Sequence, residues 1–216
     1  LFKADLLLAS DGPRVSASRP TLFLGSRGAF NFELKINLRQ GGHHSGNWGG
    51  LLKNPGVRLA NAIASICNER GKILVPGLLP KDLPDNIKRA LSTIQVGGGP
   101  NDPEIDPNWA EPGLTLAEKV FGWNTFETLA YKTGNPDAPV NAIPGYAIAY
   151  CQLRYVVGSD NEHFLDHIRA HLDAHGYDDI EVAASRGEAA EATRLDPDNA
   201  WVKMAAASIK RDRKSV

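Results

Sequence analysis

The chain has 216 residues, of which 42% are hydrophobic and 23% are charged, so it can bury a core and is not disordered as a whole. Its formal net charge of -1 gives no overall field to attract nucleic acid or an anionic membrane. No apolar run approaches the ~20 residues that a membrane-spanning helix needs. We therefore expect no nucleic acid and no membrane among its partners.

Two cysteines, Cys67 and Cys151, lie in apolar stretches, which is typical of buried thiols. Unpaired thiols indicate a reducing compartment, so we expect a cytoplasmic protein. The first residue is Leu rather than Met, and it opens a stretch with strand character. We expect this sequence to be a piece of a longer polypeptide.

The first regular elements form a strand-helix-strand unit. Residues 30–38 alternate between polar and apolar side chains, which predicts a half-buried strand. After a glycine-rich loop, Asn54 and Pro55 are typical of a helix N-cap and first turn, and apolar residues recur at helical spacing until Gly71. The apolar residues 73–75 predict a second strand.

The same order returns later in the chain. Residues 145–157 are rich in Tyr, Ile and Val and predict a long strand. Ser159 and Asp160 can cap a helix that Gly176 ends, and its apolar stripe is Phe164, Ile168 and Leu172. Alternation over residues 180–184 predicts a fourth strand.

Two such units predict an α+β fold, a ferredoxin-like two-layer sandwich with a four-stranded antiparallel sheet, two helices on one face and the other face open. Residues 77–138 between the units are proline-rich, with little periodicity except at residues 116–120 and 126–131. We interpret them as an insertion with one or two short helices. Apolar residues four apart predict a last helix after Asp196-Pro197, namely Trp201, Ala205 and Ile209.

The loop over residues 41–50 is the most unusual stretch, because it is rich in glycine and holds His43 and His44. Such a loop suits a backbone that must approach another group closely. A flexible turn with solvated imidazoles is the simpler interpretation on the residues alone, and a functional histidine is the alternative.

Two single residues also have two interpretations each. Asp11 precedes Gly12 in a turn signal, and it also follows a buried strand, where α/β enzymes place metal ligands or acids. Arg154 lies in an otherwise uncharged strand and shares a face with Tyr150 and Gln152. An arginine on an open sheet face is suited to a carboxylate, and the alternative is a surface ion pair.

Four histidines recur every four residues along the second helix: His163, His167, His171 and His175. Pairs at this spacing can bind zinc or nickel on an exposed face. The neighbouring apolar stripe already explains how the helix packs, so we interpret the histidines as a solvated edge. A dedicated metal site is the alternative.

Taken in chain order, several short motifs resemble one family, the co-catalytic di-zinc metallopeptidases and amidohydrolases. Its members include acetylornithine deacetylase, succinyl-diaminopimelate desuccinylase, carboxypeptidase G and the carnosinase-type dipeptidases. The most specific motif is His-Ser-Gly-x-x-Gly-Gly followed by Asn-Pro. The motifs are Ser10-Asp11-Gly12-Pro13, Arg19-Pro20-Thr21, Gly25-Ser26-Arg27-Gly28, His44-Ser45-Gly46-Asn47-Trp48-Gly49-Gly50, Asn54-Pro55, Asn141-Ala142-Ile143-Pro144 and Arg154.

The resemblance implies a division of the chain. Residues 20–190 would form a lid that makes a homodimer, with the insertion at about 77–138 inside it. Residues 1–19 would end one segment of a catalytic domain, and residues 191–216 would begin the next. In that family the catalytic domain holds two zinc ions.

The resemblance also implies roles for four residues in the hydrolysis of an amide bond in a small peptide or N-acyl amino acid. Asp11 would be a terminal ligand of one zinc. His44 would reach across the dimer and stabilise the oxyanion. Asn141 and Arg154 would hold the substrate's carbonyl and carboxylate. Zinc is the expected metal, and cobalt or manganese could replace it.

The sequence departs from the family pattern in its metal ligands. It contains no Glu-Glu pair and no histidine after His175, so the other ligands would lie outside it. We expect this chain alone to bind little metal and to be inactive, the activity belonging to its full-length parent. The alternative is a stand-alone ferredoxin-like binding or dimerisation module without catalytic activity.

Overall fold

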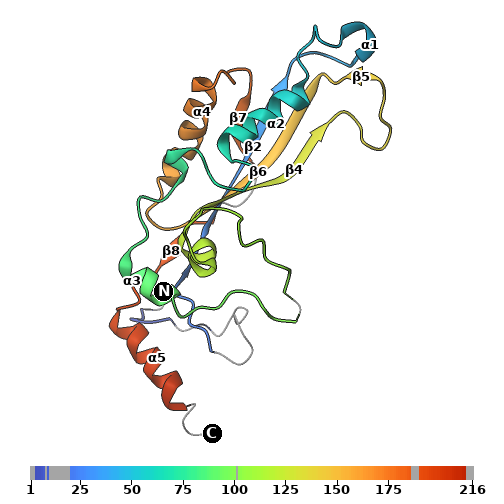
Figure 1. The fold of residues 1–216 in the computed structure, drawn as a ribbon. Coiled ribbons are helices and arrows are strands. Elements are labelled where there is room, and N and C mark those ends of the chain that lie inside the picture. Colours follow the sequence, from blue (N-terminus) through green and yellow to red (C-terminus); the bar gives the residue numbers. More distant parts are fainter. Residues whose placement is uncertain (1–2, 8, 10–19, 101, 186–189, 213–216) are drawn as a thin grey trace.

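A computed structural model describes residues 3–7, 9, 20–100, 102–185 and 190–212 (Figure 1). Its centre is an antiparallel sheet of four strands in the order β4-β6-β2-β7. The strands are β2 (Gly28–Asn37), β4 (Thr125–Thr133), β6 (Tyr146–Tyr155) and β7 (Glu181–Ala184). The predicted four-stranded antiparallel sheet in an α+β protein is therefore confirmed.

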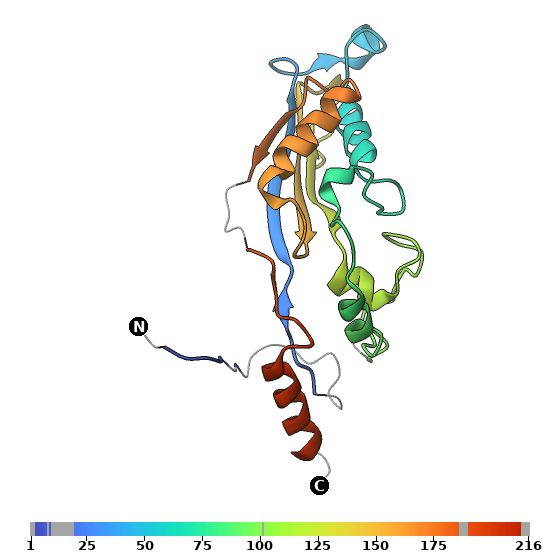
Figure 2. The ribbon, with the colours of Figure 1, turned by 90° about the vertical axis from the view of Figure 1, so that its left-hand side faces the viewer.

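Two helices, α2 (Pro55–Ile66) and α4 (Phe164–Ala174), cover one face of this sheet, and Figure 2 shows them beside each other. Between sheet and helices lies the core, to which β2 contributes the fully buried Phe32, Leu34 and Ile36. The predicted stripe of α4 is fully buried as well. Each such side chain contributes about 1.5–3 kcal/mol through the apolar surface it removes from water.

The start of α2 is as the sequence predicts. The Asn54 side chain accepts a hydrogen bond from the Val57 backbone N–H at 3.2 Å, and Pro55 occupies the first helical position. The helix ends at Ile66, earlier than the predicted end near Gly71, because Cys67 already has an extended backbone. The predicted last helix is α5 (Ala200–Asp212).

The predicted second strand was wrong. Residues 73–75 form only an isolated bridge, between Ile73 and Cys67. The strand that pairs with β6 at the edge of the sheet is instead β4, which lies within the range 77–138. The pairing of β4 with β6 shifts register between Thr128 and Ala130. This bulge interrupts the alternation of side chains, which is why the strand was hard to see in the sequence.

The segment between α2 and β4 contains a 3₁₀ turn, η1 (Pro76–Leu78), the helix α3 (Asp85–Leu91) and a π-helical turn, η2 (Glu118–Gly122), which packs against α3. The buried Asn124 ties this segment to the end of β6. Its side chain donates to the Leu78 carbonyl at 2.8 Å and accepts from the Val156 N–H at 2.8 Å.

Short elements complete the chain at the two ends of the sheet. One end carries β3 (His43–His44), which pairs with β5 (Ala142–Ile143), and α1 (Ser45–Trp48). The other end carries β1 (Gly25–Ser26) paired with β8 (Thr193–Arg194), and η3 (Asn161–His163) precedes α4. Figure 1 shows α1 and β5 at the opposite end of the molecule from α3 and α5. No described helix has the length and apolar character needed to cross a membrane.

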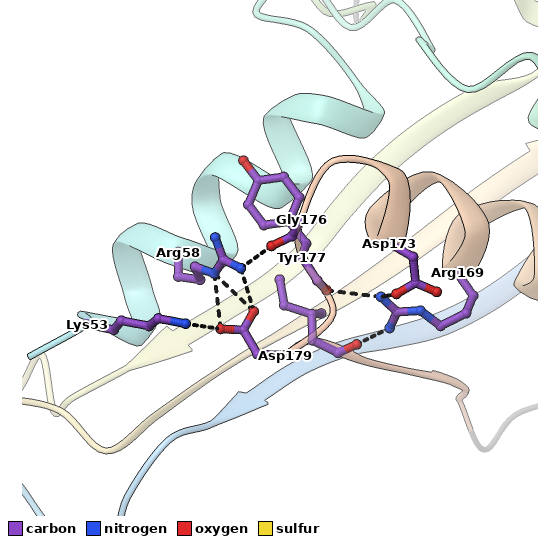
Figure 3. Close-up of polar contacts among 8 residues, drawn as sticks. Lys53, Arg58, Arg169, Asp173, Gly176, Tyr177 and Asp179 are labelled. Atoms are coloured by element: carbon purple, nitrogen blue, oxygen red, sulfur yellow. Dashed lines mark hydrogen bonds and ion pairs between the residues drawn. The ribbon is translucent and has the colours of Figure 1, made fainter.

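A polar network holds α2 against the turn between α4 and β7 (Figure 3). The Asp179 carboxylate accepts hydrogen bonds from Lys53 at 3.1 Å and from the Arg58 Nε at 3.0 Å. The Arg58 guanidinium also lies over the Tyr177 ring, 4.7 Å from its centroid. From α4, Arg169 donates to the carbonyl of Tyr177 at 3.0 Å. The helix layer is therefore fixed at its surface as well as through the core.

Candidate functional site

His44 and Asn141 lie next to each other at the end of the molecule formed by β3 and β5. The two short strands pair antiparallel with His44 opposite Ala142, the residue after Asn141. Ser45 then donates to the Asn141 carbonyl oxygen twice, from its backbone N–H at 2.9 Å and from its hydroxyl at 3.2 Å. Two motifs almost a hundred residues apart in the sequence thus form one cluster, which we call the His44–Asn141 cluster.

Gly46 leaves room for the imidazole of this cluster. A Cβ atom at Gly46 would lie 2.9 Å from the His44 Cε1 atom and 3.1 Å from Nδ1. The ring therefore lies against the backbone of Gly46. In the same loop, the His43 and Trp48 rings meet edge to face with centroids 6.3 Å apart. The loop over residues 41–50 has a defined backbone, formed by β3 and α1.

Arg39 connects the segment that follows this loop to the segment that follows β5. Its guanidinium donates to the Lys53 carbonyl at 2.8 Å and to the Pro144 carbonyl at 3.2 Å. The Gly145 carbonyl accepts from the Leu38 N–H at 2.9 Å, and a Cβ atom at Gly145 would lie 2.2 Å from the Arg39 carbonyl oxygen. Sequence analysis did not identify Arg39. Its position directly after the alternating strand and before the loop was the only available signal.

The side chains of His44 and Asn141 are both exposed. An imidazole and a primary amide offer N–H donors that can be directed at a ligand outside this chain. Donors of this kind stabilise a developing negative charge when they are held in place before the reaction.

Arg154 lies far from this cluster, near the other end of β6. It pairs with Ala29 of β2 and with Thr125 of β4. It shares the open sheet face with Gln152 and Tyr150, as the alternation predicts, because Cys151 and Leu153 are buried on the helix side. At about 3.3 Å per residue, the path along β6 from Tyr146 to Arg154 is roughly 26 Å long. The structure brings His44 and Asn141 together and keeps Arg154 apart.

A cavity of about 400 Å³ adjoins Arg154. It is also lined by Arg27, a residue that sequence analysis noted only as part of the motif Gly25-Ser26-Arg27-Gly28. Burial lowers the pKa of Arg27, and the nearby Arg154 cation lowers it further, while Glu127 acts in the opposite direction. Two guanidinium groups therefore face the same region of this end of the sheet.

The fourth predicted site residue, Asp11, lies outside the described residues. Within the described part of the chain, no group of three His, Cys, Asp or Glu side chains is arranged to hold a metal ion. The described residues therefore do not fit the di-zinc centre that the resemblance implies, and its ligands would have to come from elsewhere.

The four histidines of the second helix form two pairs. His163 Nδ1 and His167 Nε2 both contact the Asp160 carboxylate, at 2.8 and 3.0 Å, and the hydrogen bond to Asp160 raises the pKa of His163. The His171 and His175 rings lie 4.1 Å apart. Burial and the neighbouring His175 lower the pKa of His171. Each pair has local partners that explain its position.

Comparisons with known proteins identify the family and the fold of the chain. A family model described as the peptidase dimerisation domain matches residues 24–180. A cysteinylglycine-S-conjugate dipeptidase of Corynebacterium striatum is 31% identical over 126 residues, which cover 54% of this chain and 28% of that protein. A human beta-Ala-His dipeptidase is 32% identical over 80 residues, covering 37% and 16% of the two chains. The chain thus spans less than a third of the length of these relatives.

Solved structures show the same fold. An M20 family metallo-carboxypeptidase from Sulfolobus solfataricus superposes with a TM-score of 0.74 at 20% identity, covering 93% of this chain and 53% of that one. Human carnosine dipeptidase 1 gives a TM-score of 0.65 at 18% identity, covering 92% and 44%. Since the family model matches well over half of the residues, the chain belongs to the peptidase dimerisation domain family.

Proposed function

We propose that this chain is the dimerisation and lid portion of a metal-dependent amide-bond hydrolase, a dipeptidase, carboxypeptidase or N-acyl-amino-acid deacylase. The dipeptidase names of the sequence relatives support a peptidase parent. The observation that carries the proposal is the placement of the His44–Asn141 cluster and Arg154 at opposite ends of β6. The dipeptidase names of the relatives also favour a hydrolase parent over the alternative of a stand-alone binding module.

The separation of these residues has a consequence for a small substrate. A dipeptide is at most about 7 Å long, whereas the path between the two sites is roughly 26 Å. A single substrate cannot contact both sites of one chain. If both act on one amide bond, they come from different subunits of a homodimer. We therefore assign the His44–Asn141 cluster to the substrate held by the partner subunit's Arg154.

The chemistry of each site fits this assignment. The imidazole of His44 and the amide of Asn141 supply donors for the substrate's carbonyl oxygen as it becomes an oxyanion. The guanidinium of Arg154 supplies paired donors for the substrate's carboxylate. The sequence alone grouped Asn141 with Arg154 as a residue that binds substrate. We now group Asn141 with His44, because these two would contact the same substrate.

The proposed metal is zinc, with cobalt or manganese as substitutes, and it would activate the attacking water when bound in the parent. Since no group of three metal-ligating side chains occurs among the described residues, the metal would be held by residues outside them. Residues 20–190 would form the lid, a ferredoxin-like sandwich. Its strand order, in which β2 and β6 are central, supports that description.

The test uses the full-length parent with His44→Ala. We expect turnover of peptide or N-acyl amino acid substrates to be abolished and the dimer to be retained, measured by an amidase assay and by sedimentation. His175→Ala is the matched control, because its ring is exposed and its Nδ1 bonds only within α4, to the His171 carbonyl. Retained activity in His44→Ala would refute the role given to His44.

A further inference from the structure

The charged side chains among the described residues that line the cavity beside Arg154 are all cationic. Its volume of about 400 Å³ falls within the ~300–1,000 Å³ range of small-molecule sites. Three arginines line it, Arg27, Arg154 and Arg194, and none of the described lining residues is an aspartate, glutamate or lysine. We call this space the arginine cavity.

Arg27 and Arg154 approach each other across the sheet. Arg154 sits in register between Ala29 and Thr125 on its two neighbouring strands. Arg27 precedes β2, and its Nη1 reaches the Thr125 hydroxyl at 3.4 Å. The Arg27 side chain thus spans the strand that carries Arg154, which places both guanidinium groups at the same point of the cavity.

Among the described residues, few groups compensate the charges of these two cations. Arg154 makes no hydrogen bond or ion pair with the described residues, and the bond from Arg27 to Thr125 is long. Glu127 acts on Arg27 from a distance, and it is partly buried, which raises the pKa of its carboxyl while Arg27 opposes the shift. An anion between the two guanidinium groups would remove their mutual repulsion.

The remaining wall of the arginine cavity is apolar. It includes Ile87 and Leu91 of α3, Val120 and Phe121 of η2, and Val156 after β6. The Phe121 side chain is 38% exposed, so part of this wall is open to a ligand. An apolar group against this wall and an anionic group near the arginines would each meet a suitable environment.

We infer that the arginine cavity binds a carboxylate attached to an apolar side chain, with Arg27 as a second cation beside Arg154 and the wall of α3 and η2 as the side-chain pocket. The inference rests on the proposed carboxylate role of Arg154 and adds a substrate class to it. The parent enzyme would prefer substrates whose carboxylate-bearing residue is apolar. Arg27 and Leu91 would set this preference.

Direct binding to the 216-residue chain tests the site without any metal or catalysis. The probes are N-acetyl-L-leucine, its uncharged amide N-acetyl-L-leucinamide, and N-acetylglycine, which lacks the apolar side chain. We expect titration by NMR at low salt to show the tightest binding for N-acetyl-L-leucine. Equal affinity for the amide, or for N-acetylglycine, would overturn the inference, and so would absence of binding by all three.

Variants of Arg27 measure how much this residue contributes to binding. Arg27→Gln should weaken N-acetyl-L-leucine binding roughly tenfold, the usual effect of losing a hydrogen bond to a charged group, and Arg27→Lys should restore part of it. Arg70→Gln is the control, because Arg70 pairs only loosely with Glu69 at 3.9 Å and does not line the cavity. Unchanged binding in folded Arg27→Gln, checked by circular dichroism, would contradict the inference.

Activity of the parent separates this inference from the proposed function. We expect the parent to hydrolyse substrates ending in Leu faster than substrates ending in Gly. If Leu91→Ser reduces the ratio of these two rates about tenfold, both the proposed function and the cavity site are supported. Binding by the chain without hydrolysis by the parent would refute the proposed function and leave the cavity site standing. Hydrolysis with a Leu to Gly ratio that Leu91→Ser does not change would refute the cavity site alone.

Discussion

The Asn141 carbonyl oxygen accepts two hydrogen bonds from Ser45, one from its N–H at 2.9 Å and one from its hydroxyl at 3.2 Å. Because these bonds use the backbone of Asn141, its exposed side-chain amide stays available for a ligand. The Ser of the His-Ser-Gly motif thus has a structural task. It fixes the distance between the two residues that we assign to the same substrate.

Gly46→Ala tests how closely the His44 ring must be positioned. The new methyl group would lie within 2.9 Å of the ring and displace it. We expect kcat of the parent to fall roughly tenfold to a hundredfold, as misplacement of about 1 Å can cause. Stability should not fall, because Gly→Ala inside a helix is favourable by about 0.5–1 kcal/mol. Thermal unfolding and steady-state kinetics measure both.

Asn47→Ala is the matched control for that variant, since Asn47 is an exposed neighbour in the same short helix. It should leave kcat near the wild-type value. A Gly46→Ala enzyme with normal kcat would show that the ring position against Gly46 is unimportant for turnover.

Asp179→Asn tests the polar network of Figure 3. Burial opposes the charged form of Asp179, but hydrogen bonds from Arg58 and Lys53 outweigh it and hold the pKa of the carboxyl below its usual value of 3.8. Loss of the charge should lower the free energy of unfolding by about 1 kcal/mol at pH 7. Urea unfolding of the chain measures the difference.

The pH dependence of the same variant follows from the direction of the shift. A lowered pKa in the folded state stabilises the protein above the unfolded-state pKa, and this contribution disappears as the pH falls through the folded-state pKa. The wild type should therefore lose its advantage over Asp179→Asn below about pH 4. A constant difference down to pH 2 would contradict the assignment.

The two cysteines should be inert in the folded chain. Burial raises the pKa of Cys67 to about 11, with Glu127 adding to the shift, and raises the pKa of Cys151 to about 12. Since the thiolate is the reactive form, alkylation by iodoacetamide at pH 8 should be at least ~100-fold slower in the native chain than in urea. Mass spectrometry resolves the two sites. Fast native labelling of Cys151 would show that the core opens readily.

Much of the fold could be predicted because local patterns decide it. The alternation in β2, the Asn54 and Pro55 helix start and the stripe of α4 each have a direct physical cause. The second strand in sequence order could not be predicted. The β4 bulge at Thr128 and Ala130 breaks the alternation, and pairing with β6 decides that it is a strand.

The residues of the proposed site could be named one by one from the sequence, but how they lie relative to one another could not. His44, Asn141 and Arg154 stand out by motif, yet only the pairing of β3 with β5 shows that the first two lie together. Arg27 and Arg39 act through contacts with distant Thr125 and Pro144. No local spacing encodes such contacts.

The central claim is that one active site takes the His44–Asn141 cluster from one subunit and Arg154 from the other. It is tested most directly by coexpressing two inactive variants of the parent. A mixed dimer of His44→Ala and Arg154→Ala chains holds one site with all residues intact. Random assortment makes about half of the dimers mixed, so about a quarter of wild-type activity should return.

The matched mixture combines His44→Ala with Asn141→Ala. Because both residues belong to the same cluster, no site of a mixed dimer has both, and we expect activity to stay at the level of the single variants. Recovery of about a quarter of wild-type activity in the first mixture alone is the predicted result. No recovery in the first mixture, or equal recovery in both, would contradict the account.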